Sequence, residues 1–166
     1  MSLIELQTDR LKFRQFNEDD FETYAAYYAD EKLARFIGGV RTRDEAWRKM
    51  ASLIGHWALR GFGYWAVDEK ETSEFVGCVG LWHSDGWPEM ELGYWIMPEM
   101  QGKGYATEAG RKCKEFAFDV VKTDSLVSYI DPENKPSIMV AKRLGATYDK
   151  MIELLQYGTS CVYRHK

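Results

Sequence analysis

The chain has 166 residues, of which 45% are hydrophobic and 14% aromatic, and its formal net charge at pH 7 is -4. A chain of this length is expected to form one domain, residues 1–166, that buries about two-thirds of its unfolded surface. The composition argues against a largely disordered chain. The lack of a basic excess argues against a protein that binds nucleic acid.

The cysteines and the N-terminal segment exclude further classes. Cys78, Cys113 and Cys161 lie far apart in the sequence and show no spacing typical of zinc ligands, so we expect no metal. Reduced cysteines are typical of a cytoplasmic protein. No apolar run approaches the roughly 20 residues that span a bilayer, and the opening MSLIELQTDR lacks a signal-peptide pattern, so no membrane association is expected. We expect a monomer or a homodimer.

The N-terminal third predicts a strand followed by two helices. Residues 11–16, LKFRQF, alternate apolar and polar, as a half-buried strand does. Asn17 is a suitable N-cap with Asp20 at N3, and the helix after it places apolar residues at helical spacing. Thr42 and Glu45 have the spacing of a capping box at the start of the second helix.

The middle of the chain predicts three consecutive antiparallel strands, since FGYWAVD, EFVGCVGLW and MELGYWIM are short and rich in aromatic and β-branched residues. The third strand leads into the glycine-rich stretch PEMQGKGYATEA, residues 98–109, and then into an amphipathic helix. We assign to the apolar side of this helix Ala106, Ala109, Cys113, Phe116, Ala117 and Val120.

The C-terminal part predicts a strand, a short helix and two final strands. SLVSYID is the strand, residues 136–144 form the helix before the C′ glycine Gly145, and the last two strands flank residues 157–160. This order indicates an α/β fold of the α+β kind. We expect a single mixed, mostly antiparallel sheet of about seven strands with helices on both faces.

The glycine-rich turn at residues 101–106 has the character of an anion site. It follows a strand and opens a helix, where free N–H groups and the helix dipole favour negative charge. Gly102 and Gly104 let the backbone approach an anion closely, and Lys103 adds positive charge. The turn matches neither the dinucleotide fingerprint nor the P-loop. By spacing alone, a tight turn with a plain helix cap explains it about equally well.

The residues around the turn resemble the cofactor-binding core of the GNAT N-acetyltransferase superfamily. That family carries [Q/R]-x-x-G-x-[G/A] between its fourth strand and third helix. The pattern stands here as Gln101, Gly102, Lys103, Gly104, Tyr105 and Ala106. The resemblance covers nearly the whole chain. Within the superfamily, the sequence is similar to the RimJ/RimL-like branch of ribosomal-protein N-terminal acetyltransferases. The segments that carry it are TDRLKFRQFNEDD, FVGCVGL, ELGYWIMPEMQGKGYATEA and DPENKPSIMVAKRLG.

This resemblance implies a site for acetyl-CoA as cosubstrate. The backbone of residues 101–106 is expected to wrap the pyrophosphate. The strand 92–97 is expected to splay from SLVSYID, between strands 4 and 5 of the sheet, and to leave a cleft for the pantetheine arm. Backbone groups near Ile96 and Met97 would bind that arm, and an N–H there could polarise the thioester carbonyl.

The proton donor that the wider family often uses is absent. It is a tyrosine four residues before the glycine that ends the last helix, and this position is Ala141 here. In the RimJ/RimL-like branch an N-x-x-S pattern takes over, so Asn134 is expected to contact the cofactor and Ser137 to lie near the sulfur. Both residues also have a structural interpretation, as the N-cap and N3 residues of the short helix, and the two interpretations are compatible.

Glu91 is the candidate general base, because it begins the splayed strand near the expected acceptor cleft. An exposed glutamate at a strand end is the plainer alternative, and His83 and Asp85 are rival candidates. Several aromatic residues could line the acceptor cleft, although packing in the core is the more common role for such residues. They are Trp82, Trp87, Trp95, Tyr157 and Tyr163.

The sequence therefore predicts an N-acetyltransferase that transfers acetyl from acetyl-CoA to a primary amine by direct attack in a ternary complex. The amine is either a protein N-terminus or a small molecule, and the sequence does not distinguish them. No cysteine lies in the turn or beside a histidine, so a covalent acyl-enzyme has no support. A non-catalytic CoA-binding sensor with the same fold is the alternative, and a purely structural interaction domain is a weaker one.

Overall fold

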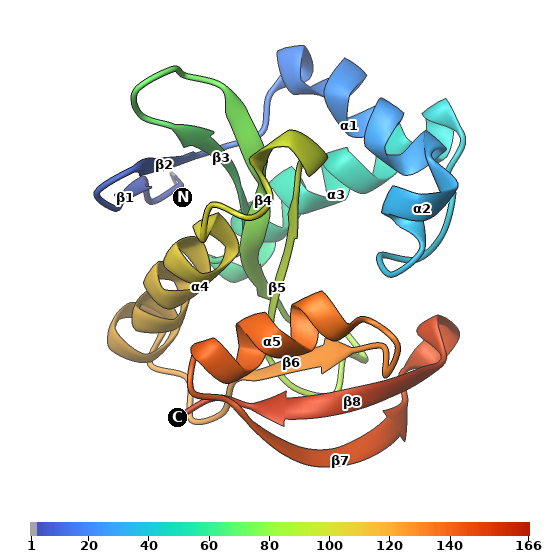
Figure 1. Cartoon of the computed structure of the whole chain (residues 1–166), viewed down its shortest axis with the longest axis vertical. Coiled ribbons are helices and arrows are strands. Elements are labelled where there is room, and N and C mark those ends of the chain that lie inside the picture. The colour runs from blue at the N-terminus through green and yellow to red at the C-terminus, as the bar shows by residue number, and fades with distance from the viewer. Residues whose placement is uncertain (1–2) are drawn as a thin grey trace.

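The computed structural model describes residues 3–166, and within this range one eight-stranded sheet runs through the molecule (Figure 1). The strand order is β1-β2-β3-β4-β5-β6-β8-β7, and all neighbours are antiparallel except β5 and β6. The strands are β1 (Leu6–Gln7), β2 (Leu11–Arg14), β3 (Tyr64–Glu69), β4 (Phe75–Trp82), β5 (Glu91–Ile96), β6 (Val127–Ile130), β7 (Thr147–Glu153) and β8 (Thr159–Arg164).

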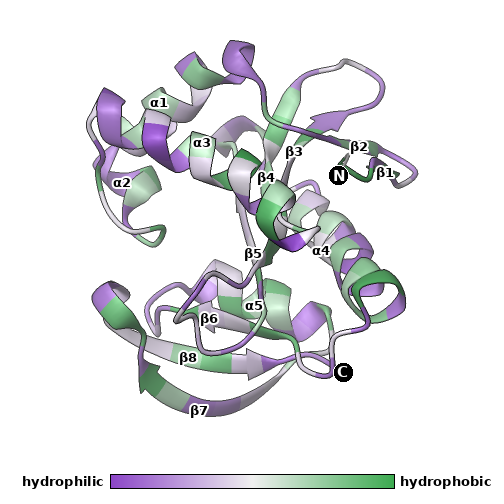
Figure 2. Cartoon of the chain, turned by 180° about the vertical axis from the view of Figure 1, so that it is seen from behind, coloured by the Kyte–Doolittle hydropathy of each residue, from purple (hydrophilic) through white to green (hydrophobic). Residues whose placement is uncertain are grey.

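Helices cover both faces of this sheet, and in the described range none is both long and apolar enough to cross a membrane. The N-terminal half of the fold carries α1 (Phe21–Ala29), α2 (Glu31–Ala34) and α3 (Arg43–Arg60). The other two are α4 (Tyr105–Phe116), directly after the glycine-rich turn, and α5 (Lys135–Arg143), beside β6. The back view in Figure 2 shows hydrophobic and hydrophilic residues mixed along α1 and α4, as expected for helices with one face on a sheet.

Alternation of side chains along β3 and β5 builds two cores. On β3, Trp65 and Val67 face the core that holds α4, whereas Ala66 between them faces the core formed with α1 and α3. On β5, Leu92 and Trp95 divide in the same way. The side-chain period of two in a strand therefore explains why both faces are apolar and both are covered.

The predicted caps are confirmed. Asn17 and Thr42 each accept a hydrogen bond from the backbone in a complete capping box, with Asp20 and Glu45 as the returning partners. The Asn17 box opens a short 3-10 turn at Glu18–Asp20, and α1 continues from it. Such caps satisfy N–H groups that a helix start otherwise leaves unpaired.

The expected single sheet of about seven strands is confirmed; it has eight, because the short β1 pairs with β2 and adds an edge. Two other expectations need correction. Val120 does not join the apolar side of α4, since the helix widens into a π-helix over Ala117–Val121 and leaves that side chain 56% exposed. The last hairpin turns through Leu155–Tyr157, so Thr159 and Ser160 already belong to β8.

The sheet opens between β5 and β6, as expected. One residue pair joins the two strands, Glu91 with Val127, and beyond it they diverge. The Ser128 hydroxyl then donates to the Leu92 carbonyl at 2.7 Å and lies 2.9 Å from the Nε2 atom of His165. Because the serine proton is used on the carbonyl, His165 donates from Nε2. A chain of side-chain hydrogen bonds thus replaces the missing backbone ladder at the fork.

The buried His165 in this hydrogen-bond network predicts that the folded protein loses stability in acid. Burial, with a smaller contribution from the charge of Lys114, lowers the pKa of His165 to about 4 from its ordinary 6.5. Between these pH values His165 is protonated in the unfolded chain but stays neutral in the folded chain. The contribution of His165 to the free energy of unfolding is therefore complete above pH 6.5 and is lost as pH falls toward 4. The free energy of unfolding should therefore fall by up to about 3 kcal/mol over this window because of His165 alone.

Urea titrations at several pH values, on the wild type and on His165→Gln, measure this contribution. All other titrating groups are shared, so the difference in unfolding free energy between the two proteins should shrink as pH falls from 7.5 to 4.5. Parallel pH dependences would contradict the assignment of a neutral buried His165.

Candidate active site

The glycine-rich turn before α4 exposes a run of unpaired backbone donors. Gly102 and Gly104 adopt left-handed conformations with φ of 77° and 80°, and Gly104 is the N-cap of α4. Within residues 3–166, the N–H groups of residues 102–107 have no hydrogen-bond acceptor, and the first paired N–H is that of Glu108, which donates to the Gly104 carbonyl at 3.0 Å. Such a group of donors at a helix start fits a phosphate.

The space over these donors is open. A Cβ added at Gly102 would meet no atom within 4 Å, and one added at Gly104 would meet only the Arg10 guanidinium, at 3.6 Å. Lys103 between them is exposed, and its Nζ lies 5.9 Å from the centre of the Tyr105 ring. The turn thus offers backbone donors and positive charge with no side chain over them.

Three further residues of the motif have defined places. The Gln101 amide donates to the Ile96 carbonyl at 3.1 Å and ties the turn to the end of β5. The Tyr105 side chain is buried and its hydroxyl donates to the carboxylate of Glu69, so Tyr105 can offer a ligand its backbone N–H but not its ring. Ala106 packs against the core below α4, so it too can offer a ligand only its backbone N–H.

The open edge of β5 presents backbone groups of alternate residues. The carbonyls of Leu92 and Ile96 accept from side chains on the β6 side, so the N–H groups of Tyr94 and Ile96 face that side as well. Met97 differs, because its N–H donates to the Val76 carbonyl at 2.8 Å. Of the N–H groups expected near Ile96 and Met97, that of Met97 is therefore already paired. Ile96 and Tyr94 hold the available groups.

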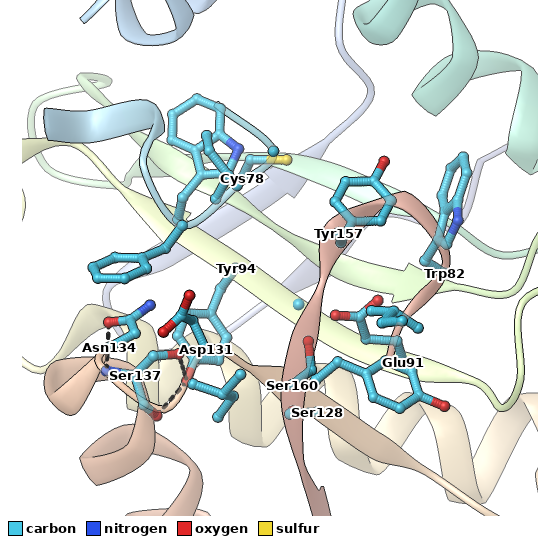
Figure 3. Close-up of a pocket in the computed structure, with 18 of the residues that line it drawn as sticks. Cys78, Trp82, Glu91, Tyr94, Ser128, Asp131, Asn134, Ser137, Tyr157 and Ser160 are labelled. Atoms are coloured by element: carbon cyan, nitrogen blue, oxygen red, sulfur yellow. Dashed lines mark hydrogen bonds between the residues drawn. The ribbon is translucent and has the colours of Figure 1, made fainter. Parts of the chain in front are cut away.

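A cavity of about 450 Å³ lies where β5 and β6 part. Its walls come from α1, the segment between α2 and α3, α3, the central strands, the start of α5 and the C-terminal hairpin. Figure 3 shows Asn134, Ser137 and Tyr94 at one end of it, and Glu91, Trp82 and Tyr157 toward the other. The aromatic residues of the lining are Tyr24, Tyr28, Phe36, Tyr64, Trp82, Trp87, Tyr94, Trp95, Tyr129 and Tyr157.

Tyr94 contacts Ser137, one of the two residues predicted at the start of α5. Its hydroxyl donates to the Ser137 carbonyl at 2.8 Å and lies 3.0 Å from the Ser137 hydroxyl, which is left to act as the donor in that contact. Asn134 accepts from the Ser137 N–H at 3.3 Å as the N-cap, which leaves its amide nitrogen facing the cavity without a protein acceptor in the described chain. Ala141, where the family tyrosine is missing, is fully buried.

Glu91 begins β5 and lines the cavity. Burial raises the pKa of its carboxyl to about 7, against smaller lowering effects of the Trp87 indole, the backbone near Tyr129 and the Lys49 ammonium. The Trp87 indole is close enough to influence the carboxylate but forms no hydrogen bond to any atom of residues 3–166. A carboxyl that titrates near neutrality can take and release a proton at physiological pH.

Of the other candidate residues from the sequence, some line the cavity and some do not. Tyr157 and the three tryptophans line the cavity, although packing in the core was the favoured interpretation, and Trp95 serves both roles because it stacks on Tyr27 at 4.1 Å. Tyr163 packs in the hydrophobic cluster of the C-terminal hairpin. His83 and Asp85, the rival bases, are not among the residues that line the cavity.

Comparison with known proteins identifies the family. The model of the acetyltransferase (GNAT) domain matches residues 10–147 of this chain. The chain belongs to the GNAT acetyltransferase family. This GNAT protein is 31% identical to the acetyltransferase from Agrobacterium tumefaciens str. C58, with a TM-score of 0.92 over 100% of this chain and 96% of that one. It is 30% identical to the uncharacterized protein YkkB of Bacillus subtilis (strain 168), over 89% of this chain and 87% of the relative.

More distant GNAT structures show the same fold. The RimL ribosomal L7/L12 alpha-N-protein acetyltransferase, solved in complex with coenzyme A, has a TM-score of 0.78 at 16% identity over 98% of this chain and 97% of that one. The spermidine N-acetyltransferase from Vibrio cholerae, solved with CoA and spermine, has a TM-score of 0.74 at 16% identity over 95% and 94%. The fold of this chain is thus the GNAT fold, and the chain is an acetyltransferase.

The sequence did not reveal three polar residues of the cavity. Tyr94 lies in ELGYWI between residues that belong to the core, and nothing in the strand pattern sets it apart. Arg41 comes from the segment before α3 and Lys49 from the helix itself, more than 40 residues before Glu91 in the sequence. Only the fold brings them to one cavity.

Proposed function

We propose that this acetyltransferase transfers the acetyl group of acetyl-CoA to a primary amine by direct attack in a ternary complex. The observation that carries the proposal is the arrangement of three features along β5. The unpaired N–H groups of residues 102–107 follow its end, its edge toward β6 is open, and the cavity lies beside Glu91 at its start. Acetyl-CoA, when bound, supplies the acetyl group as a thioester. The RimL and spermidine acetyltransferase structures, both solved with CoA, support this use of the fold.

The residues of this arrangement have distinct proposed tasks. Residues 101–106 hold the pyrophosphate through their backbone. Tyr94 and Ile96 offer backbone groups to the pantetheine arm and the thioester carbonyl, and Asn134 adds its amide. Glu91 accepts a proton from the incoming ammonium group, directly or through water, so that the amine nitrogen can attack the thioester carbon as the carbon–sulfur bond breaks.

Ser137 and Tyr94 serve the leaving sulfur. Burial raises the pKa of Tyr94 to about 12, well above the pKa of a free thiol, about 8.5. A hydroxyl with such a pKa is a weak acid toward a thiolate, so we assign it a positioning role. In the resting enzyme it accepts the hydrogen bond of the Ser137 hydroxyl, and as negative charge develops on the sulfur this hydroxyl turns from Tyr94 and donates to the sulfur instead. In this proposal Ser137 and Tyr94 take the role of the tyrosine that the wider family often carries where this chain has Ala141.

Two substitutions test this pair. Ser137→Ala and Tyr94→Phe should each lower kcat by about 10-fold or more, since a hydrogen bond to a charged group is lost, while the KM for acetyl-CoA changes little. Tyr163→Phe is the matched control, because that tyrosine packs in the C-terminal cluster and does not line the cavity. An unchanged kcat in Ser137→Ala would remove Ser137 from the catalytic residues.

Release of free thiol from acetyl-CoA over a panel of amines tests the proposed function itself. We expect acetylated product, identified by mass spectrometry, together with thiol release in equal amount. Tight CoA binding without thiol release for any amine would favour the non-catalytic sensor. The acceptor of the RimJ/RimL-like branch, a protein N-terminus, belongs in this panel beside polyamines and amino acids.

A further inference from the structure

Two cations that line the cavity lack a carboxylate partner within the described chain, although the Lys49 Nζ lies 5.8 Å from the centre of the Tyr28 ring. The two are Arg41 and Lys49, and neither forms an ion pair with any carboxylate of residues 3–166. They are close enough for the charge of Arg41 to lower the pKa of Lys49, after the larger effect of burial. Two like charges in a half-buried site are unfavourable without a counter-ion, so an anionic ligand is the natural partner.

Arg35 shows what a satisfied cation at this cavity looks like. It also lines the cavity, but its guanidinium lies 2.6 Å from the carboxylate of Glu133, and both side chains are more than half exposed. The pair links α2 to the turn before α5. Arg41 differs in that its Nε is buried and donates to no acceptor in the described chain.

The polar groups left unsatisfied in the cavity are mainly donors. Five buried side-chain N or O atoms in residues 3–166 have no hydrogen-bond partner, and four of them belong to residues that line this cavity. Two of the four, Arg41 Nε and Trp87 Nε1, can only donate, and the others are the hydroxyls of Tyr24 and Tyr129. A buried donor without an acceptor is costly, so this lining favours a ligand that brings oxygen acceptors.

The cavity also contains negatively charged groups, which are suited to bind an amine. Glu91 lines the cavity at the start of the open edge of β5, and Asp131 follows β6. An ammonium group at Glu91 and an anionic group at Arg41 and Lys49 would each meet the opposite charge. A polyamine would meet repulsion from Arg41 and Lys49 at any second ammonium group.

The cavity also restricts the size of the acceptor. A Cβ added at Gly38 would lie 3.1 Å from the Arg41 guanidinium and 3.2 Å from the ring of Tyr157, so the segment before α3 and the C-terminal hairpin approach each other there. The volume of about 450 Å³ includes the end lined by Asn134 and Ser137, which the pantetheine arm would use. What remains suits a small molecule better than a protein chain.

We propose that the acceptor is a small amine that carries a carboxylate, with the carboxylate bound by Arg41 and Lys49 and the amine directed to Glu91. This inference rests on the proposed transfer of acetyl to a primary amine, and it narrows the acceptor to amino-acid-like molecules. The carboxylate supplies the acceptors that the Arg41 and Trp87 donors lack.

Matched pairs of acceptors test the proposal. Each common L-amino acid is compared with its own amide, and spermidine and a short peptide with a free N-terminus complete the panel. We expect kcat/KM for the best amino acid to exceed that for its amide by about 10- to 100-fold, as loss of a charged hydrogen bond implies. Arg41→Gln and Lys49→Met should each remove most of this preference, measured within each variant as the ratio of kcat/KM for the acid to kcat/KM for the amide.

Arg48→Gln is the control for net charge, because Arg48 adjoins Lys49 in α3 but is exposed and pairs with Asp44 outside the cavity. It should keep the full preference for the carboxylate. If one cavity variant fails to fold, the other still measures the preference. Equal rates for acid and amide, or a best rate with spermidine or the peptide, would overturn this inference and leave the proposed acetyl transfer intact. CoA binding with no acetylation of any amine would instead overturn the proposed function.

Discussion

Gly104→Leu is expected to weaken the binding of CoA by about 100-fold or more while the protein still folds. Gly104 has φ of 80° and ψ of 10°, a left-handed conformation that costs an ordinary residue about 1–2 kcal/mol. A leucine side chain here would project into the open space beside the unpaired N–H groups of residues 102–107. It would keep a phosphate from several charge-assisted hydrogen bonds at once, which is why the expected loss is large.

Calorimetric titration with CoA measures the effect, and Gly61→Leu provides the control. Gly61 caps the end of α3 with φ of 77° and ψ of 7°, so a leucine there meets nearly the same backbone strain away from the turn. Gly61→Leu should lower the melting temperature about as much as Gly104→Leu and bind CoA normally. An unchanged affinity in Gly104→Leu would refute the assignment of the turn to the pyrophosphate.

The main elements of the fold were predictable because they depend on local signals. The caps at Asn17 and Thr42, the alternation along β2 and the glycine at the end of α5 act over a few residues, and each was confirmed. The failures also have local causes. The π-helix at Ala117–Val121 changes the helical period in mid-helix, and a pattern based on 3.6 residues per turn cannot show it.

The candidate site was predictable where a motif is contiguous and where the family resemblance names the residue, as at Asn134 and Ser137. Residues 101–106 form one turn, and their backbone geometry follows from the two glycines. The cavity, by contrast, collects residues from most elements of the fold, and the environment of each depends on what the others exclude from water. The pKa of Glu91 and the unpaired charges of Arg41 and Lys49 result from this burial, which sequence spacing does not encode.

Glu91→Gln is expected to lower activity and to raise stability. At pH 8 the wild-type residue is a carboxylate, since its pKa is about 7, and it can accept the ammonium proton of the acceptor. Glutamine cannot, so kcat/KM should fall by about 10²- to 10⁴-fold, the range for loss of a general base. In the wild type, kcat/KM should fall as pH drops through 7, because Glu91 becomes protonated. With an acceptor whose amine titrates near pH 10, this limb is separate from that of the amine and should vanish in Glu91→Gln.

The stability effect has the opposite sign and follows from the same pKa. The folded chain raises the pKa of Glu91 from 4.5 to about 7, so it prefers the neutral form, and stability is lost as pH rises between these values. Glutamine stays neutral. At pH 8 the variant should therefore be more stable than the wild type, by up to about 3 kcal/mol in the free energy of unfolding.

Glu89→Gln separates these effects from the removal of any carboxylate. Glu89 pairs with Arg164 at 2.8 Å, and this pairing lowers its pKa to about 2, so its removal should destabilise the protein at pH 8 and leave the pH profile of kcat/KM intact. A variant at position 91 that lost activity and stability together would point to a structural role. Lower activity with higher stability is the result expected for a buried general base. Burying the charged carboxylate destabilises the folded protein, and only the reaction requires that carboxylate.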